Sequence, residues 1–225
     1  MAYRQTDNVA RKLAARHDAI LAAAGEAAAE GGIAAVQMAL VAERAGIAAG
    51  TVYRYFPSKA DLVVALVAAF SERELAALEA AANAAPGPLS ALAAVITTFS
   101  VRALARRRLA FALIAEPAEP EVDAARASYR RTLAAEFEEL IRKALAGGHL
   151  PDQDAAIAAA ALVGVLIEGL IGPLAPAGGD PAKARAQVQM LTLFALRGLG
   201  VVDARARGLV VQTVVPEESS GPPRS

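Results

Sequence analysis

The chain has 225 residues, enough for one large or two small domains with a substantial core. Its 23 basic and 23 acidic residues cancel, which excludes a globally basic nucleic-acid coat and confines any nucleic-acid surface to a local patch. There is no cysteine, which excludes disulfides and thiolate chemistry and fits a reducing compartment, so we expect a cytoplasmic protein.

The N-terminal arm is one such local patch. Through His17 it carries Asp7 as its single acid against several basic residues. These are Arg4, Arg11, Lys12 and Arg16. The same stretch lacks the apolar core of a secretory signal. The arm is therefore a candidate surface for contact with nucleic acid.

Nearly every segment is predicted to be helical, because alanine and leucine are abundant and no sustained alternation of β-branched residues occurs before the tail. The first helix is predicted from near Asp7 to Glu30, and Gly31-Gly32 ends it. Two short helices follow, at 38–45 and 49–56. A longer helix begins near Ser58 and ends before the Pro-Gly-Pro sequence of 86–88.

The second half is predicted to contain five further helices, with Asp152 and Asp180 as the caps of the last two. Their predicted ranges are 89–105, 109–115, 120–146, 152–172 and 181–199. The tail from about 201 ends in PEESSGPPRS and is expected to be disordered. The pattern thus predicts a domain at 1–58, a larger helical domain at 59–200 and a tail at 201–225.

The apolar stretch 155–179 permits two interpretations. Its length would allow a membrane span, and its only charged residue is Glu168. A central carboxylate is unfavourable in lipid, however, and Pro173 and Pro176 interrupt the stretch. We therefore favour a buried or subunit-interface helix.

Residues 38–57, MALVAERAGIAAGTVYRYFP, have the pattern of a helix-turn-helix. Ala42 is small enough for the two helices to touch, and Gly46 can adopt the left-handed backbone of a sharp turn. Val52 is placed to pack back on the first helix. The second helix then carries several side chains of the kinds that donate to phosphates and reach base edges, among them Thr51 and Arg54.

The stretch AGIAAGTVYRYFPSK resembles the DNA-binding domain of the tetracycline-repressor (TetR) family. The family signature is an alanine-glycine turn, then Gly-Thr-apolar-Tyr-x-aromatic-Phe, then a lysine two or three positions later. The resemblance covers about residues 15–65. It implies an all-α fold, with an N-terminal three-helix DNA-binding domain and a larger helical domain for ligand binding and dimerisation.

The resemblance also implies a set of DNA-contacting residues on and around the second short helix. By this resemblance Tyr53 and Lys59 hold phosphates, with further phosphate contacts from the basic arm, whereas Thr51 and Arg54 sense bases. The full predicted set is Gln37, Arg44, Ala49, Gly50, Thr51, Tyr53, Arg54, Tyr55 and Lys59. Gln37 and Ala48 depart from the family pattern, which has a capping Thr or Ser at the first position and Ser at the second.

Several of these residues have a structural alternative. Phe56 is expected in the core, since aromatic rings bury a large area. Tyr55 is predicted either to pack in the core or to bind phosphate. Arg54 is predicted to read DNA, with a solvated helix residue as the alternative.

A helix-turn-helix that binds as a dimer places two recognition helices about 34–36 Å apart, so a pairing surface is needed. The helices at 155–171 and 183–199 each carry an apolar stripe with small residues, and we favour a dimer interface over a helix pair buried within one chain. The predicted interface residues are Leu162, Leu166, Gly169, Leu170, Val188, Leu191, Ala195 and Leu199.

The central helices are expected to enclose a mostly apolar pocket for a hydrophobic or amphipathic small molecule. The alternative for its aromatic residues is ordinary core packing. The predicted lining is Thr98, Phe99, Arg102, Phe111, Tyr129, Phe137 and Glu168.

These features predict a ligand-responsive, homodimeric transcriptional repressor on a palindromic DNA operator. The alternatives are an activator or ligand-independent regulator of the same fold, or a helical ligand-binding protein with an inert head. An enzyme is not expected, because His17 and His149 are the only histidines and no metal-ligand spacing or phosphate loop is present. No cofactor or metal is expected.

Overall fold

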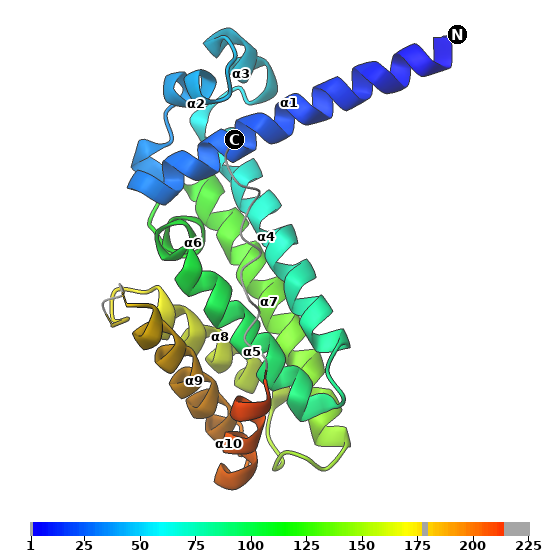
Figure 1. Ribbon diagram of the computed structural model, residues 1–225, viewed down its shortest axis with the longest axis vertical. Helices are drawn as coiled ribbons and strands as arrows, with labels where there is room; N and C mark the ends of the chain where they lie inside the picture. Colours follow the sequence, from blue (N-terminus) through cyan, green and yellow to red (C-terminus); the bar gives the residue numbers. More distant parts are fainter. Residues whose placement is uncertain (1, 177–179, 214–225) are drawn as a thin grey trace. The chain divides into compact units, whose positions relative to one another are not determined.

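The computed structural model describes residues 2–176 and 180–213, and within these ranges the regular structure is helical throughout (Figure 1). The elements are α1 (Ala2–Gly31), η1 (Ile33–Ala35), α2 (Met38–Arg44), α3 (Ala49–Tyr55), α4 (Lys59–Asn83), α5 (Pro88–Ala105), α6 (Arg107–Ile114), α7 (Pro120–Ala146), α8 (Ala155–Leu170), α9 (Pro181–Gly198) and α10 (Asp203–Gln212). The all-α prediction is confirmed.

The chain divides into two compact units at positions that differ from the predicted boundary at 58. Unit one contains the described residues up to Arg73 together with Arg106–Arg130. Unit two contains Glu74–Ala105 and the described residues from Arg131 onward. The boundaries at 73/74 and 130/131 fall inside α4 and α7, so a continuous helix crosses each and the sequence shows no break there, while the third boundary falls between α5 and α6.

The core of unit one joins the helix-turn-helix to α1, α4 and α6. Ile20, Ala24 and Ala27 on α1 are fully buried, as is Val52 on α3. From α6, Leu109 and Leu113 belong to the same apolar cluster. The small alanines let α1 and α6 pack closely, so the head is completed by residues more than 50 positions downstream.

The end of α1 is fixed by Gly32 and by a carboxylate from the α6–α7 connector. Gly32 has φ +72°, a left-handed backbone that favours glycine. The Ile33 N–H donates to Glu116 Oε2 at 3.2 Å. A Cβ on Gly32 would lie 2.5 Å from that oxygen, so glycine is needed for space as well as for backbone conformation.

Unit two is built on α5, whose buried face contacts α8, α9 and α10. Thr97 on α5 and Thr192 on α9 are both buried, and their hydroxyls lie 3.3 Å apart, which satisfies two polar groups within the core. α5 is the one described helix long and apolar enough to cross a membrane, but 61% of it is buried, as in a core helix.

Two predictions for the second half are wrong. The helix α8 is capped by Asp154, which accepts from the Ile157 N–H at 2.9 Å, and not by Asp152. The predicted disordered tail instead begins with α10, which buries Ala206 and Leu209 and is tied to α9 by an ion pair between Arg197 and Asp203. Residues 214–225 lie outside the described residues.

Candidate nucleic-acid interface

The turn between α2 and α3 has the geometry that the sequence predicts. Gly46 has φ +66°, and the Gly46 and Ile47 N–H groups donate to the carbonyls of Glu43 and Ala42 at 3.1 and 3.0 Å. Ala42 and Val52 are buried where the two helices meet. The turn therefore fixes α3 against α2 while its outer face stays in solvent.

That outer face carries the side chains predicted to read DNA. Tyr53 is 51% exposed and Arg54 is exposed, while Thr51 is half-buried. Ala49 and Gly50 are exposed at the start of α3, and a Cβ on Gly50 would meet nothing within 4 Å. The open space beside Gly50 leaves room for the backbone of α3 to approach a nucleic acid.

Tyr55 and Phe56 face inward instead. Phe56 is buried, as predicted, and its ring lies 5.3 Å from that of His17 on α1. The Tyr55 hydroxyl donates to the Leu13 carbonyl at 3.5 Å, and its ring lies 6.4 Å from that of His17. Tyr55 thus packs on α1, the first of the two alternatives that the sequence leaves open, while its side chain stays half-buried.

Arg44 is held in an ion pair that the sequence did not reveal. Its two terminal nitrogens donate to the Glu30 carboxylate at 3.1 and 2.6 Å, and its side chain is only 24% exposed. The hydrogen bond from Arg44 lowers the pKa of Glu30 and raises that of Arg44. Arg44 therefore ties α2 to the end of α1.

The start of α4 carries a reciprocal cap between Ser58 and Asp61. The Ser58 hydroxyl accepts from the Asp61 N–H at 3.1 Å, and the Ser58 N–H donates to the Asp61 carboxylate at 3.1 Å. Lys59 is half-buried in this first turn. The cap was detectable as Ser-x-x-Asp in the sequence.

By contrast, the starts of α2 and α3 lack side-chain caps. Neither Gln37 nor Ala48 makes a capping hydrogen bond. Gln37 is exposed. The two departures from the family pattern therefore cost local hydrogen bonds while leaving both helices in place.

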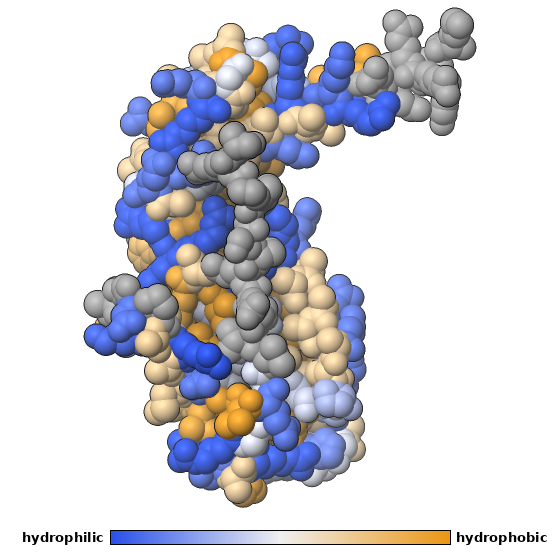
Figure 2. All heavy atoms as spheres, viewed as in Figure 1, coloured by the Kyte–Doolittle hydropathy of each residue, from blue (hydrophilic) through white to orange (hydrophobic). Residues whose placement is uncertain are grey.

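Hydrophilic residues also gather along the described part of α1 (Figure 2). Arg11, Lys12 and Arg16 are exposed on this helix. Val9 and Leu13 are exposed on the same helix. The basic arm is thus a continuation of α1, which begins at Ala2 and not near Asp7.

The predicted dimer stripe instead packs within the chain. Six of its eight members are buried, namely Leu162, Leu166, Leu170, Val188, Ala195 and Leu199. Gly169 and Leu191 face each other, since a Cβ on Gly169 would lie 3.1 Å from Leu191. Helical periodicity identified the apolar face correctly, but α8 and α9 use that face for each other and for α5.

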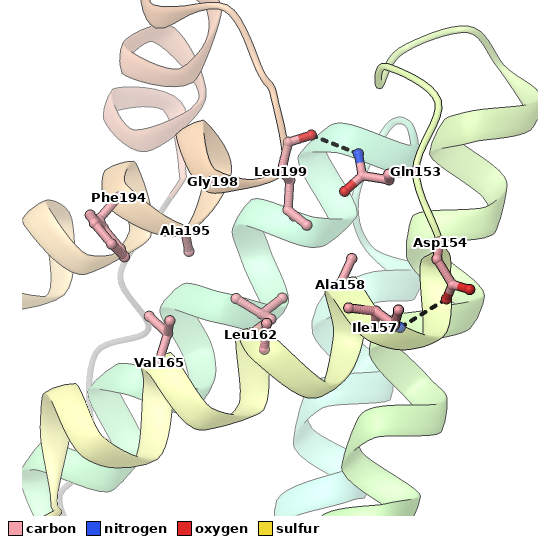
Figure 3. Close-up of a pocket in the computed structure, with 11 residues that line it drawn as sticks. Gln153, Asp154, Ile157, Ala158, Leu162, Val165, Phe194, Ala195, Gly198 and Leu199 are labelled. Carbon is pink, nitrogen blue, oxygen red and sulfur yellow. Dashed lines mark hydrogen bonds between the residues drawn. The ribbon is translucent and has the colours of Figure 1, made fainter.

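Outside the buried stripe these helices also expose apolar side chains, and the groove between them is lined in part by Leu162, Ala195 and Leu199 of the predicted stripe. Ile157 on α8 is 70% exposed, and Met190 and Phe194 on α9 are 65% and 61% exposed. A groove of about 370 Å³ runs between the helices, with Phe194 and Val165 at one end and Gln153 and Asp154 at the other (Figure 3). Large apolar side chains beside a groove are typical of an interaction surface.

The seven predicted ligand-lining residues are divided between the two units. Phe111 and Tyr129 belong to unit one, whereas Thr98, Phe99, Arg102, Phe137 and Glu168 belong to unit two. Phe99 and Phe137 are core residues, and Glu168 is exposed on α8. Arg102 forms a bidentate ion pair with Glu74, with both distances 2.7 Å. No group of three or more His, Asp or Glu in the described ranges could hold a metal.

Known proteins match this chain at two levels. Residues 20–66 match the family described as Bacterial regulatory proteins, tetR family. The HTH-type transcriptional repressor KstR of Rhodococcus jostii (strain RHA1) is 53% identical over 58 residues, which cover 26% of this chain and 27% of KstR. The chain thus matches about a quarter of that relative's length.

Solved structures extend the likeness to the whole fold. The structure of RolR with resorcinol has a TM-score of 0.67 at 24% identity, covering 93% of this chain and 100% of RolR. The regulator FadR from Bacillus subtilis, solved with stearoyl-CoA, has a TM-score of 0.64 at 20% identity, covering 77% of this chain and 96% of FadR. Residues 20–66 of this chain thus match the family described as Bacterial regulatory proteins, tetR family, and the helical fold that carries them is like that of these regulators.

Proposed function

We propose that the chain is a cytoplasmic transcriptional repressor that binds a palindromic operator as a homodimer, and that a hydrophobic or amphipathic small molecule releases it. It regulates by binding and catalyses no reaction. The observation that carries this proposal is the α3 face, where Tyr53 and Arg54 are exposed on a helix anchored by the Gly46 turn. Such a helix fits the major groove, where arginine and polar side chains read base edges.

The direct test is binding to the DNA upstream of the gene, titrated across salt, with Arg54→Ala compared with Arg131→Ala. Both arginines are exposed, and the two variants remove the same charge. We expect Arg54→Ala to weaken binding by about 1–3 kcal/mol and Arg131→Ala to leave it unchanged. Equal effects of the two variants, or binding that ignores sequence, would reject α3 as the recognition helix.

The sign of regulation needs a second experiment. The KstR match supports repression, but it covers only the DNA-binding part of that protein. Deleting the gene should raise expression from a reporter placed behind the operator. A fall in expression would identify an activator instead.

The homodimer is proposed to form through the outer faces of α8 and α9. Ile157, Met190 and Phe194 expose apolar area there, and Ala161 and Gly164 are small, exposed residues at the same helical register on α8. Two copies of such a helix pair can pack as a four-helix interface, burying area that each chain leaves in water.

Sedimentation equilibrium of the full chain tests this surface. Phe194→Glu should convert a dimer to a monomer, because it places a charge in the apolar contact. Val211→Glu, at a still more exposed apolar position on α10, is the matched control and should stay dimeric. A monomeric wild type, or a dimeric Phe194→Glu, would contradict the assignment.

An effector is proposed to act in unit two, around Phe99 and Phe137. The supporting observations are that RolR and FadR, which share the fold, were solved with resorcinol and with stearoyl-CoA. Because Phe99 and Phe137 are buried against other side chains, the pocket would open only in a second conformation that the ligand prefers.

Resorcinol and stearoyl-CoA are the two probes for this step. One of them should release the protein from its operator, and Phe99→Leu should weaken that release while leaving DNA binding without ligand intact. If neither probe changes operator affinity, both compounds are excluded as effectors. If release occurs but Phe99→Leu does not alter it, the ligand binds elsewhere.

A further inference from the structure

A second groove lies entirely within unit two, where the end of α4, the start of α5 and the last turns of α7 come together. Its volume is about 330 Å³. It shares no residue with the α8–α9 groove or with the residues predicted to line an effector pocket. This second groove is therefore separate from the surfaces and the pocket proposed above.

The floor of the second groove is apolar. Leu78 on α4, Ala91 and Val95 on α5 and Leu140 on α7 are all buried side chains that line it. Gly87 and Pro88 form one end, where the α4–α5 turn passes. An apolar floor of this size can cover one ring or a short branched chain.

The rim of the second groove is acidic. It carries the exposed carboxylates Glu79, Glu136 and Glu139 and one ammonium, that of Lys143. Lys143 Nζ lies 3.5 Å from Glu139 Oε1, so this base is already matched to one acid. The described residues place no ion pair on Glu79 or Glu136.

The positions of Glu79 and Glu136 explain why they stay without a basic neighbour. One turn before and after Glu79 on α4 stand Leu75 and Asn83. One turn before and after Glu136 on α7 stand Thr132 and Leu140. Neither helix supplies a cation at the spacing that would neutralise these carboxylates. Two negative charges therefore border the apolar floor from two different helices.

We propose that this groove is a binding site for a small organic cation with an apolar body, such as an aromatic or branched alkyl ammonium ion. The apolar part would lie on Leu78, Ala91 and Val95, and the charge would lie between Glu79 and Glu136. The charge complementarity selects against anions and neutral molecules of the same shape, since these lose the attraction to both carboxylates.

Calorimetry on the full chain with benzyltrimethylammonium tests the site, with neopentylbenzene as the neutral molecule of the same shape. The cation should bind saturably, and the neutral molecule should bind about tenfold more weakly. Glu79→Gln combined with Glu136→Gln should weaken cation binding by about five- to tenfold, because both charges are exposed and screened. Added salt should reduce the difference in cation affinity between the wild type and the double variant, because it screens the two carboxylates.

Two further variants separate charge from shape. Glu72→Gln removes an exposed carboxylate outside the groove and should leave cation binding unchanged. Ala82→Leu fills the groove without changing its charge and should weaken the binding of both the cation and the neutral molecule. The proposal is overturned if the cation fails to saturate, if the neutral molecule binds equally well, or if the double Gln variant, shown folded by circular dichroism, binds like the wild type.

Discussion

At the scale of single residues, two glycines in the helix-turn-helix have opposite roles. Gly46 adopts φ +66°, with no atom within 4 Å of a built Cβ, so an added side chain would meet only backbone strain there. Gly50 lies inside α3 with ordinary helical backbone and the same open space. The first glycine is required by the turn, whereas the second weakens the helix in which it lies.

Replacing each glycine with alanine should therefore change stability in opposite directions. We expect Gly46→Ala to lower the free energy of unfolding by about 1 kcal/mol or more, from left-handed strain. Gly50→Ala should raise it by about 0.5–1 kcal/mol, because alanine is the better helix former. Urea unfolding of both variants measures the free energy of unfolding. Changes of the same sign in the two variants would contradict the opposite roles of the two glycines.

The Glu30–Arg44 pair gives the head a dependence on pH. Because the hydrogen bond from Arg44 lowers the pKa of Glu30 below its ordinary 4.5, the pair stabilises the folded state at pH values above 4.5. That contribution is lost as the pH falls through the lowered value, where the folded carboxylate takes up its proton.

Glu30→Gln should remove this part of the acid sensitivity. The variant is expected to be less stable than the wild type at pH 7, and the difference should shrink as the pH is lowered through the window below 4.5. Thermal unfolding from pH 7 to pH 3 measures it, with Glu72→Gln as an exposed control. A difference that is constant over this range would reject the linkage.

At the scale of helices, some helix N-termini have a side-chain cap and others have none. The first turn of α4 is capped by Ser58, which accepts from the Asp61 N–H. The helices α8 and α9 are capped by Asp154 and Asp180 in the same way. Ala48 precedes α3 with an extended backbone, φ −67° and ψ 143°, but has no side chain to accept a hydrogen bond. The recognition helix thus depends on packing through Val52 to hold its first turn.

Ala48→Ser should supply the missing cap. The extended backbone at 48 suits a capping residue, so we expect a gain of about 0.5–1 kcal/mol in the free energy of unfolding. Ser58→Ala, which removes an existing cap, should lose about 1 kcal/mol and is the opposite control. Guanidinium unfolding measures both, and a neutral or destabilising Ala48→Ser would show that α3 gains nothing from a cap.

At the scale of the whole molecule, the DNA-binding head is not a contiguous segment. Its apolar cluster includes Leu62 and Leu66 from α4, Leu109 and Leu113 from α6, and Val122 from α7. The helix-turn-helix is therefore stabilised by residues that follow it at a distance in the sequence. This arrangement ties the geometry of the head to helices beyond it.

A fragment of residues 1–58 should consequently fail to fold by itself. It lacks every α4, α6 and α7 member of the cluster, and small domains depend on each buried side chain. Circular dichroism should show no cooperative melt for the fragment. In the full chain, Leu113→Ala should lower stability by about 2–5 kcal/mol. A fragment that melts cooperatively at the full-chain temperature would contradict this prediction.

The sequence by itself determined the all-α class, the position of the helix-turn-helix and its turn, because these depend on local backbone preference and on spacing within about twenty residues. Ala42, Gly46, Val52 and Phe56 lie where that spacing predicts. Only the tertiary structure decided what each apolar face packs against and which large apolar residues stay outside. Leu166 on α8 is buried, whereas Phe194 on α9, which lies outside the predicted stripe, is exposed. It also decided the partners of Arg44 and Glu116, since contacts between residues distant in sequence leave no periodic signal along the chain.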